Sequence, residues 1–164
     1  MTTYVALLRG IGPTDPNMHP RKLAEMFEKL GFKAVTSVIS SGNVVFDSPS
    51  RDTAALEAKI ERALPKHLGF TSTAIVRSRA ELESMLKKEP FKGKIHGTEH
   101  YLLVSFFKDR RRAPGGAAYT AIDLSRELPV RVMPRLERSF GKAVTSRTWK
   151  TVGRIVKKME AMHG

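Results

Sequence analysis

Short apolar runs alternate with amphipathic segments through the first half of the chain. The segments predicted as strands there are residues 3–9, 34–40, 43–47 and 71–77. A helix is predicted from Pro20 to Gly31, because Leu23, Met26, Phe27 and Leu30 recur at helical spacing. A second helix, capped near Ser50 or Asp52, carries an apolar face up to Pro65, which should end or kink it. The order strand-helix-strand-strand-helix-strand predicts a ferredoxin-like α+β fold.

The predicted sheet of this half is apolar on both of its faces. The first strand presents Tyr4, Ala6 and Leu8 on one side and Val5 and Leu7 on the other. Two helices can cover only one face, so we expect an element of the second half to pack on the other. The domain prediction is therefore a ferredoxin-like half over residues 1–78 and a basic α+β half over residues 79–164, forming one compact, intertwined domain.

The second half has a less regular pattern. Ser78 and Glu81 have the spacing of a capping box, which predicts a helix that ends before Pro90. The strands expected in this half are residues 101–107, 119–124 and 130–133. A loop is expected over residues 108–116, a short helix over 134–140 and a final helix over about 146–162.

Charge separates the two halves. The chain of 164 residues has a net charge of +13, and residues 83–164 hold 18 of the 29 basic side chains but only 8 of the 16 acidic ones. Nine Lys or Arg residues lie between Arg131 and Lys158, with Glu137 as the one acidic residue among them. Such a field attracts polyanions, although a basic surface also serves solubility alone.

Three segments resemble one known family. They are YVALLRGI at residues 4–11, SSGNVVF at 40–46 and TSRTWKTV at 145–152. Together, and in this order, they resemble the bacterial family called domain of unknown function 1697. The resemblance implies an α+β fold with ferredoxin-like elements and no established activity. Two departures from the family pattern are the loop that follows Ile11, which lacks the usual Gly-Gly and Lys, and Thr148 and Lys150, which replace two asparagines.

The same three segments contain the candidate ligand-binding residues. Arg9 ends an apolar strand, where a guanidinium can hold a carboxylate or a phosphate, or pair with a structural acid. The turn containing Ser41 and Asn43 offers backbone amides to an anion, but a hairpin turn explains the same residues better. Arg147 is expected at the start of the final helix, where free amides and the helix dipole favour an anion. Trp149 could stack on a base, although its spacing with Val152 and Val156 favours a place in the core.

The final helix and the loop over residues 108–116 supply the candidate polyanion contacts. On the helix they are Lys150, Arg154 and Lys157, and in the loop they are Arg110 and Arg111. The first hypothesis is a non-enzymatic protein that binds nucleic acid or another polyanion through this basic surface. The alternative is an enzyme or sensor that binds a small phosphorylated or carboxylate ligand between the two halves. A third interpretation makes the three family segments purely architectural.

Several classes of site are not indicated by the sequence. The absence of cysteine excludes disulfides, thiolate metal sites and a cysteine nucleophile. No phosphate-binding glycine motif, nucleophile elbow or metal-binding histidine motif is present, so we expect no metal and no cofactor. The third strand lacks the exposed aromatic residues of an RNA-recognition motif. Without a signal peptide or a long apolar segment, a cytoplasmic protein with no membrane partner is expected.

Overall fold

The computed structural model describes residues 1–9, 19–39, 42–141 and 143–163. The chain divides into two compact units, the first formed by Met1–Leu82 and Arg154–Gly164 and the second by Glu83–Gly153. The elements of the first half are β1 (Thr2–Leu8), α1 (Pro20–Lys29), β2 (Lys33–Ser37), β3 (Asn43–Ser48), α2 (Thr53–Leu68) and β4 (Ala74–Ser78). They are followed by α3 (Arg79–Lys88), β5 (His100–Phe107), β6 (Ala117–Asp123), α4 (Pro129–Phe140), β7 (Val144–Thr148) and α5 (Trp149–Met162).

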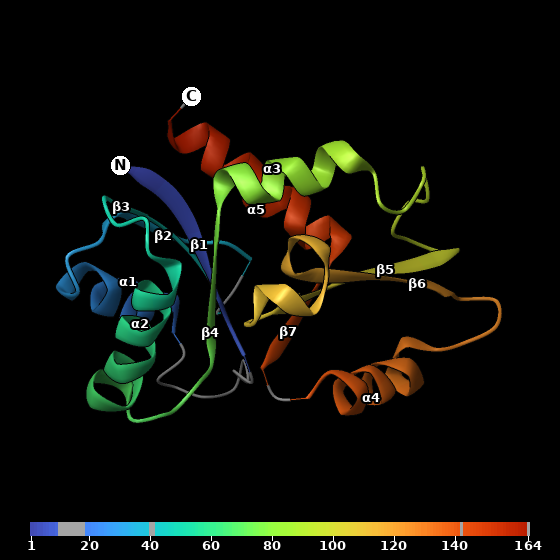
Figure 1. The fold of residues 1–164 in the computed structure, drawn as a ribbon, viewed down its shortest axis with the longest axis horizontal. Helices are drawn as coiled ribbons and strands as arrows, with labels where there is room; N and C mark the ends of the chain where they lie inside the picture. Colours follow the sequence, from blue (N-terminus) through green and yellow to red (C-terminus); the bar gives the residue numbers. More distant parts are fainter. Residues whose placement is uncertain (10–18, 40–41, 142, 164) are drawn as a thin grey trace. The chain divides into compact units, whose positions relative to one another are not determined.

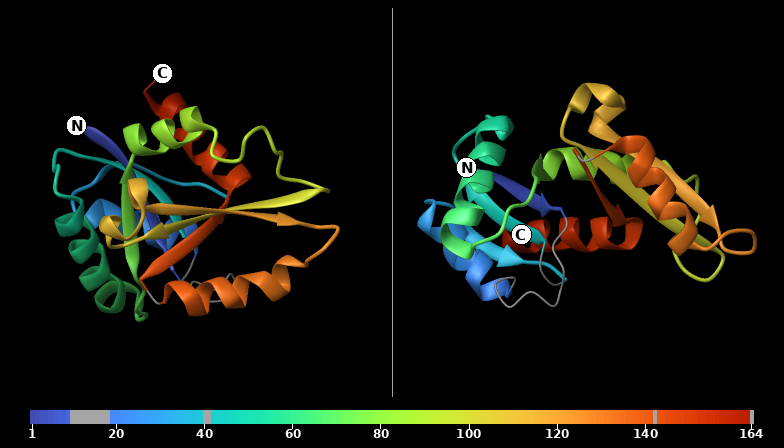
Figure 2. Two further views of the ribbon diagram at one scale, coloured as in Figure 1. Left: turned by 45° about the vertical axis from the view of Figure 1, so that its right-hand side comes forward. Right: turned by 90° about the horizontal axis from the view of Figure 1, so that it is seen from below.

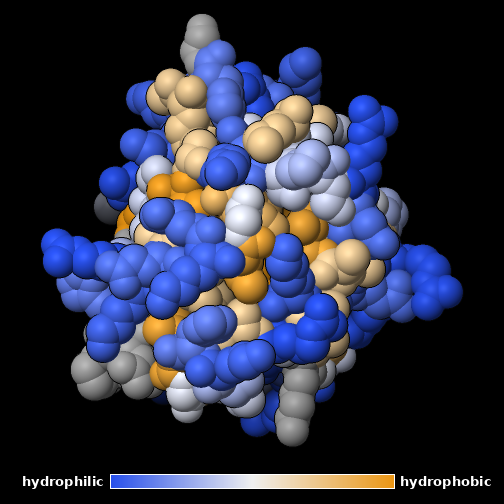
Figure 3. Space-filling view, turned by 90° about the vertical axis from the view of Figure 1, so that its left-hand side faces the viewer, coloured by the Kyte–Doolittle hydropathy of each residue, from blue (hydrophilic) through white to orange (hydrophobic). Residues whose placement is uncertain are grey.

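The first unit contains a four-stranded antiparallel sheet with the order β2-β3-β1-β4. This order, with α1 and α2 as crossovers, confirms the predicted ferredoxin-like arrangement (Figure 1). The two helices cover one face of the sheet. Their outward positions carry mostly charged residues, and hydrophilic side chains cover most of the surface shown in Figure 3.

The core of the first unit lies between the two helices and the sheet. Phe46 is its centre, because its ring contacts three other rings at centroid distances of 5.7 Å (Tyr4), 5.6 Å (Phe27) and 4.4 Å (Phe32). All four rings are buried. Truncating such a side chain costs about 3–5 kcal/mol of stability, so this cluster is a main stabilising feature of the unit.

Two glutamates of α2 protect the edge of this sheet. Glu57 accepts a hydrogen bond from the backbone N–H of Val76 at 2.9 Å, and Glu61 accepts one from Ala74 at 3.1 Å. Both donors belong to the edge strand β4, where unpaired N–H groups otherwise invite pairing with another chain. Glu57 is buried for this reason, although its side chain is acidic.

The opposite face of the sheet is also buried, as the two-sided apolar pattern required. Val5, Val45 and Ile75 lie on it and are fully inaccessible to solvent. The last turns of α5 belong to the same unit and are followed by His163, whose imidazole reaches Asp47 on β3.

The second unit contains a three-stranded antiparallel sheet with the order β6-β5-β7 (Figure 2). Helix α4 contacts it through Phe140, whose ring packs edge-on against Phe107 of β5 at 5.1 Å. Of the twelve residues of α4, only Val132 is buried, so this helix contributes less core than α1 or α2.

The structure corrects four details of the sequence prediction. Residues 130–133, predicted as a strand, lie in α4, and Pro134 lies inside this helix and does not begin one. Pro65 does not end α2, which continues to Leu68 before Gly69 ends it in a left-handed conformation (φ +77°). The final helix begins at Trp149, because the preceding residues form β7, a strand that the sequence did not predict.

Candidate functional site

The turn that contains Ser41 and Asn43 has a structural role on its described side. The Nδ2 atom of the buried Asn43 donates to the carbonyl of Val38 at 3.2 Å, and the N–H of Val38 donates to the carbonyl of Asn43 at 2.9 Å. Gly42 adopts a left-handed φ of +97°, which a side chain would oppose. Ser41 lies outside the described residues. The amide of Asn43 therefore holds the hairpin between β2 and β3.

Arg9 directly follows β1 and is partly buried. Its backbone is held from two sides, because its N–H donates to the carbonyl of Thr73 at 3.0 Å and its carbonyl accepts from the Ser72 hydroxyl at 2.6 Å. These bonds fix where the side chain starts. The role of the Arg9 guanidinium in ligand binding stays a prediction.

The sequence placed Arg147 at the N-terminus of the final helix, but the structure does not. Arg147 is in β7, where it pairs with Val104 of β5. Its Nη1 atom donates to the hydroxyl of Thr145 at 2.7 Å and to the carbonyl of Ser146 at 2.8 Å, so the guanidinium bonds to its own strand. Burial lowers the pKa of Arg147 to about 10, because a charged guanidinium loses its hydration there.

The N-terminus of α5 is capped by Thr148. The Thr148 hydroxyl accepts a hydrogen bond from the backbone N–H of Thr151 at 3.2 Å and bonds to the Thr151 hydroxyl at 3.0 Å. One of the free amides that an anion would need is therefore already used. Arg147 lies two residues before the helix begins, and the anion site at the start of the helix stays a prediction.

Trp149 belongs to an aromatic cluster of the second unit. Its ring packs edge-on against Phe91 at 5.2 Å and against Tyr119 at 6.3 Å, and Phe91 contacts Tyr119 at 5.7 Å. Desolvation in this cluster raises the pKa of Tyr119. The contacts favour the core interpretation of Trp149 over that of a base-stacking platform.

The basic face of α5 is the most extended set of cationic side chains on one element. Lys150, Arg154 and Lys157, with the neighbouring Lys158, are all exposed. The opposite side of the helix is buried through Val152, Ile155, Val156 and Met159. Within the described part of the chain, none of these four cations has an ion-pair partner. Their charges are therefore directed to solvent.

The arginines of residues 108–116 are engaged locally. The exposed guanidinium of Arg111 forms two bonds to the Asp109 carboxylate, at 3.1 and 3.2 Å, and this pairing lowers the pKa of Asp109. Arg112 stacks over the Phe107 ring at 4.5 Å and donates to the carbonyl of Phe140 at the end of α4. Arg110 is partly exposed in the same turn. Arg110 and Arg111 stay predicted polyanion contacts, but the charge of Arg111 is balanced by Asp109.

One arginine of α4 is also paired with an acidic side chain, unlike the cations of α5. Arg131, Arg135 and Arg138 are exposed at the spacing i, i+4, i+7, as on α5. Arg135, however, pairs with Glu127 at 3.0 Å. The face of α5 is therefore the better candidate for a free basic surface.

Two further observations bear on the class of site. No helix in the described part of the chain is long and apolar enough to cross a membrane. Among residues 1–9, 19–39, 42–141 and 143–163, no group of three or more His, Asp or Glu side chains is arranged to hold a metal ion.

Comparison with known proteins identifies the family. Residues 1–148 match the family described as protein of unknown function DUF1697, and the chain belongs to this family. A solved structure, that of a conserved bacterial protein from Streptococcus pneumoniae, is similar with a TM-score of 0.66 and 19% identity. The match covers 98% of this chain and 99% of that one, and at this identity it supports the fold alone. No curated protein matches the chain significantly.

Proposed function

We propose that this protein binds nucleic acid, or another polyanion of similar charge density, through the basic face of α5 and without catalysing a reaction. The supporting observation is that Lys150, Arg154 and Lys157 are exposed and lack acidic partners in the described chain, while the other side of the helix is buried. Core packing therefore uses only the apolar side of α5. The cationic side is available to a partner.

The dimensions of this face suit a phosphate backbone. Eight residue steps separate Lys150 from Lys158, and a helix rises about 1.5 Å per residue, so the cations extend over about 12 Å. Phosphates follow one another every ~3.4 Å along one strand of a duplex. The face thus spans three to four phosphates of a strand. Contacts of this kind give affinity and steep salt dependence but little sequence preference.

The test is fluorescence polarisation with a labelled single strand and a labelled duplex, from about 50 to about 200 mM salt. Two charge-reversal variants are compared with the wild type. Lys150→Glu with Arg154→Glu alters α5, and Arg62→Glu with Lys66→Glu alters two exposed residues at the same spacing on α2. Both double variants change the net charge by the same amount, and thermal unfolding confirms that each one is folded.

We expect the α5 variant to lose at least about tenfold in affinity, because each reversed charge repels the backbone. The α2 variant should stay within about threefold of the wild type, since charges beyond a Debye length of ~10 Å are screened. Equal losses in both variants would mean that only net charge matters. Salt-independent binding, or no binding at low salt, would also refute the proposal.

A further inference from the structure

The segment between α3 and β5 borders a cavity that is separate from the basic face of α5. The cavity has a volume of about 700 Å³ and is lined by residues 92–95 and 97–100, all within the second unit. This volume is within the usual range for sites that hold small molecules. Sequence patterns did not single out this segment, because its glycines and lysines are typical of an ordinary exposed loop.

The loop is fixed to the rest of its unit at three points. Phe91 is buried in the aromatic cluster with Tyr119 and Trp149. His96 accepts a hydrogen bond from the backbone N–H of Leu102 through Nδ1 at 3.0 Å, and the N–H of Gly97 donates to the carbonyl of His100 at 2.9 Å. These contacts preorganise the loop, which reduces the conformational entropy that a ligand must remove.

The backbone of the loop also carries strain. Glu89 and Lys92, on either side of Phe91, have left-handed φ values of +45° and +51°. Residues with a side chain seldom adopt this conformation, and each such residue costs stability. The buried Phe91 holds the chain in this path, and Lys92 emerges from it at the cavity.

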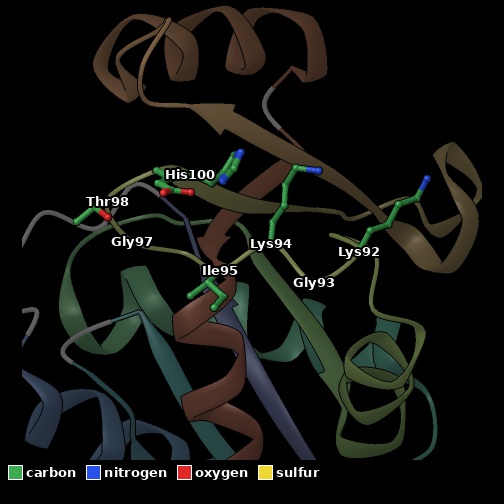
Figure 4. A pocket seen from close by; sticks show the side chains of 8 residues that line it. Lys92, Gly93, Lys94, Ile95, Gly97, Thr98 and His100 are labelled. Carbon is green, nitrogen blue, oxygen red and sulfur yellow. The ribbon is translucent and has the colours of Figure 1, made fainter.

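The side chains in the cavity divide by chemistry. Lys92 and Lys94 supply two ammonium groups, and together with His100 their side chains extend to the same side of the loop, opposite to Ile95 (Figure 4). Thr98, Glu99 and His100 lie together in sequence where the loop enters β5. One end of the cavity thus offers two cations to a phosphate, and the other offers hydroxyl, carboxylate and imidazole groups to a polar ligand.

From this arrangement we infer a second binding site, for a small phosphorylated compound that carries hydroxyl groups, such as a sugar phosphate or a nucleotide. Lys92 and Lys94 bind the phosphate. The Glu99 carboxylate accepts a hydrogen bond from a ligand hydroxyl, which the backbone of DNA does not offer. The site is independent of the proposed binding of polyanions by α5.

Isothermal titration calorimetry with ATP, ribose 5-phosphate, inorganic pyrophosphate and ribose tests this inference. ATP, ribose 5-phosphate and pyrophosphate should bind, and ribose should not. Lys92→Ala with Lys94→Ala should weaken ATP binding at least about tenfold, the loss expected for charge-assisted bonds. The matched control removes two exposed lysines of the same unit by Lys87→Ala with Lys88→Ala, and should leave ATP affinity unchanged.

A second variant separates the two ends of the cavity. Glu99→Ala should weaken the binding of ribose 5-phosphate but not that of pyrophosphate, because pyrophosphate has no sugar hydroxyl for the carboxylate. Oligonucleotide affinity should be unchanged in the Lys92 and Lys94 variant, and ATP affinity should be unchanged in the α5 charge-reversal variant. No binding of any phosphate compound, equal losses in both lysine pairs, or loss of ATP binding in the α5 variant would each overturn the inference.

Discussion

The Nε2 atom of His163 lies 2.8 Å from the Oδ2 atom of Asp47, which joins the end of α5 to β3 of the ferredoxin-like sheet. The second carboxylate oxygen of Asp47 accepts a hydrogen bond from the Thr3 hydroxyl at 2.7 Å. Asp47 is buried, so these two partners replace the hydrogen bonds that water would otherwise make to its carboxylate. A buried carboxylate that loses one partner is destabilising.

His163→Ala should therefore lower the free energy of unfolding by about 1–2 kcal/mol. Urea denaturation followed by circular dichroism measures the change. His67→Ala is the control, because His67 is exposed near the end of α2. If both histidine variants have the same midpoint, the contact with Asp47 does not stabilise the fold.

Arg147 should make stability depend on alkaline pH. Its pKa is about 10 in the folded protein, below the ordinary value of an arginine, so the unfolded chain binds the proton more tightly. The cost of burying the charge is fully present below pH 10 and decreases as the pH rises above 10. Relative to that of Arg147→Met, the free energy of unfolding of the wild type should increase by about 1 kcal/mol between about pH 9 and pH 11. Parallel denaturation curves for the two proteins at these pH values measure the gain, and a constant difference would contradict it.

The salt dependence of oligonucleotide binding should report individual phosphate contacts. Lys150→Ala should reduce the slope of log affinity against log salt by about one unit, because one fewer counterion is released. Lys66→Ala on α2 should leave the slope unchanged. Polarisation titrations at four or more salt concentrations give both slopes. Indistinguishable slopes for Lys150→Ala and the wild type would remove this lysine from the interface.

The single tryptophan provides an internal probe of the same complex. Because Trp149 packs against Phe91 and Tyr119, a saturating oligonucleotide should leave its emission maximum unchanged. Trp149→Phe should bind with wild-type affinity. Strong quenching on binding, together with weaker binding by the phenylalanine variant, would show that the indole stacks on a base.

Local sequence signals predicted the features that depend on neighbouring residues. The capping box of α3 is an example, since the Ser78 hydroxyl accepts from the Glu81 N–H and the Glu81 carboxylate accepts from the Ser78 N–H, at 3.2 and 3.1 Å. The core face of α1 follows its helical spacing in the same way. The sequence of each of these elements is sufficient to predict it. The resemblance to the DUF1697 family was likewise visible in three short segments.

Features that depend on distant residues were not predictable in this way. The polar strand β7, with the sequence Val-Thr-Ser-Arg-Thr, lacks apolar alternation and is held by pairing with β5, including the Ser105 and Ser146 hydroxyls at 2.9 Å. Pro65 and Pro134 both lie inside helices, although each proline removes a backbone hydrogen bond there. Because β7 was missed, Arg147 was assigned to a helix terminus that begins two residues later.

The first unit is interrupted in the chain, since Arg154–Gly164 joins it only after the whole of Glu83–Gly153. A ribosome adds about 5–20 residues per second, so His163 follows Leu82 by roughly 4–16 seconds. During this interval Asp47 has no imidazole to bind. The sheet face that carries Val5, Val45 and Ile75 then also lacks the last turns of α5, which complete the unit. A fragment that stops at Leu82 would stay in that unfinished state, with an apolar sheet face for chaperones to recognise.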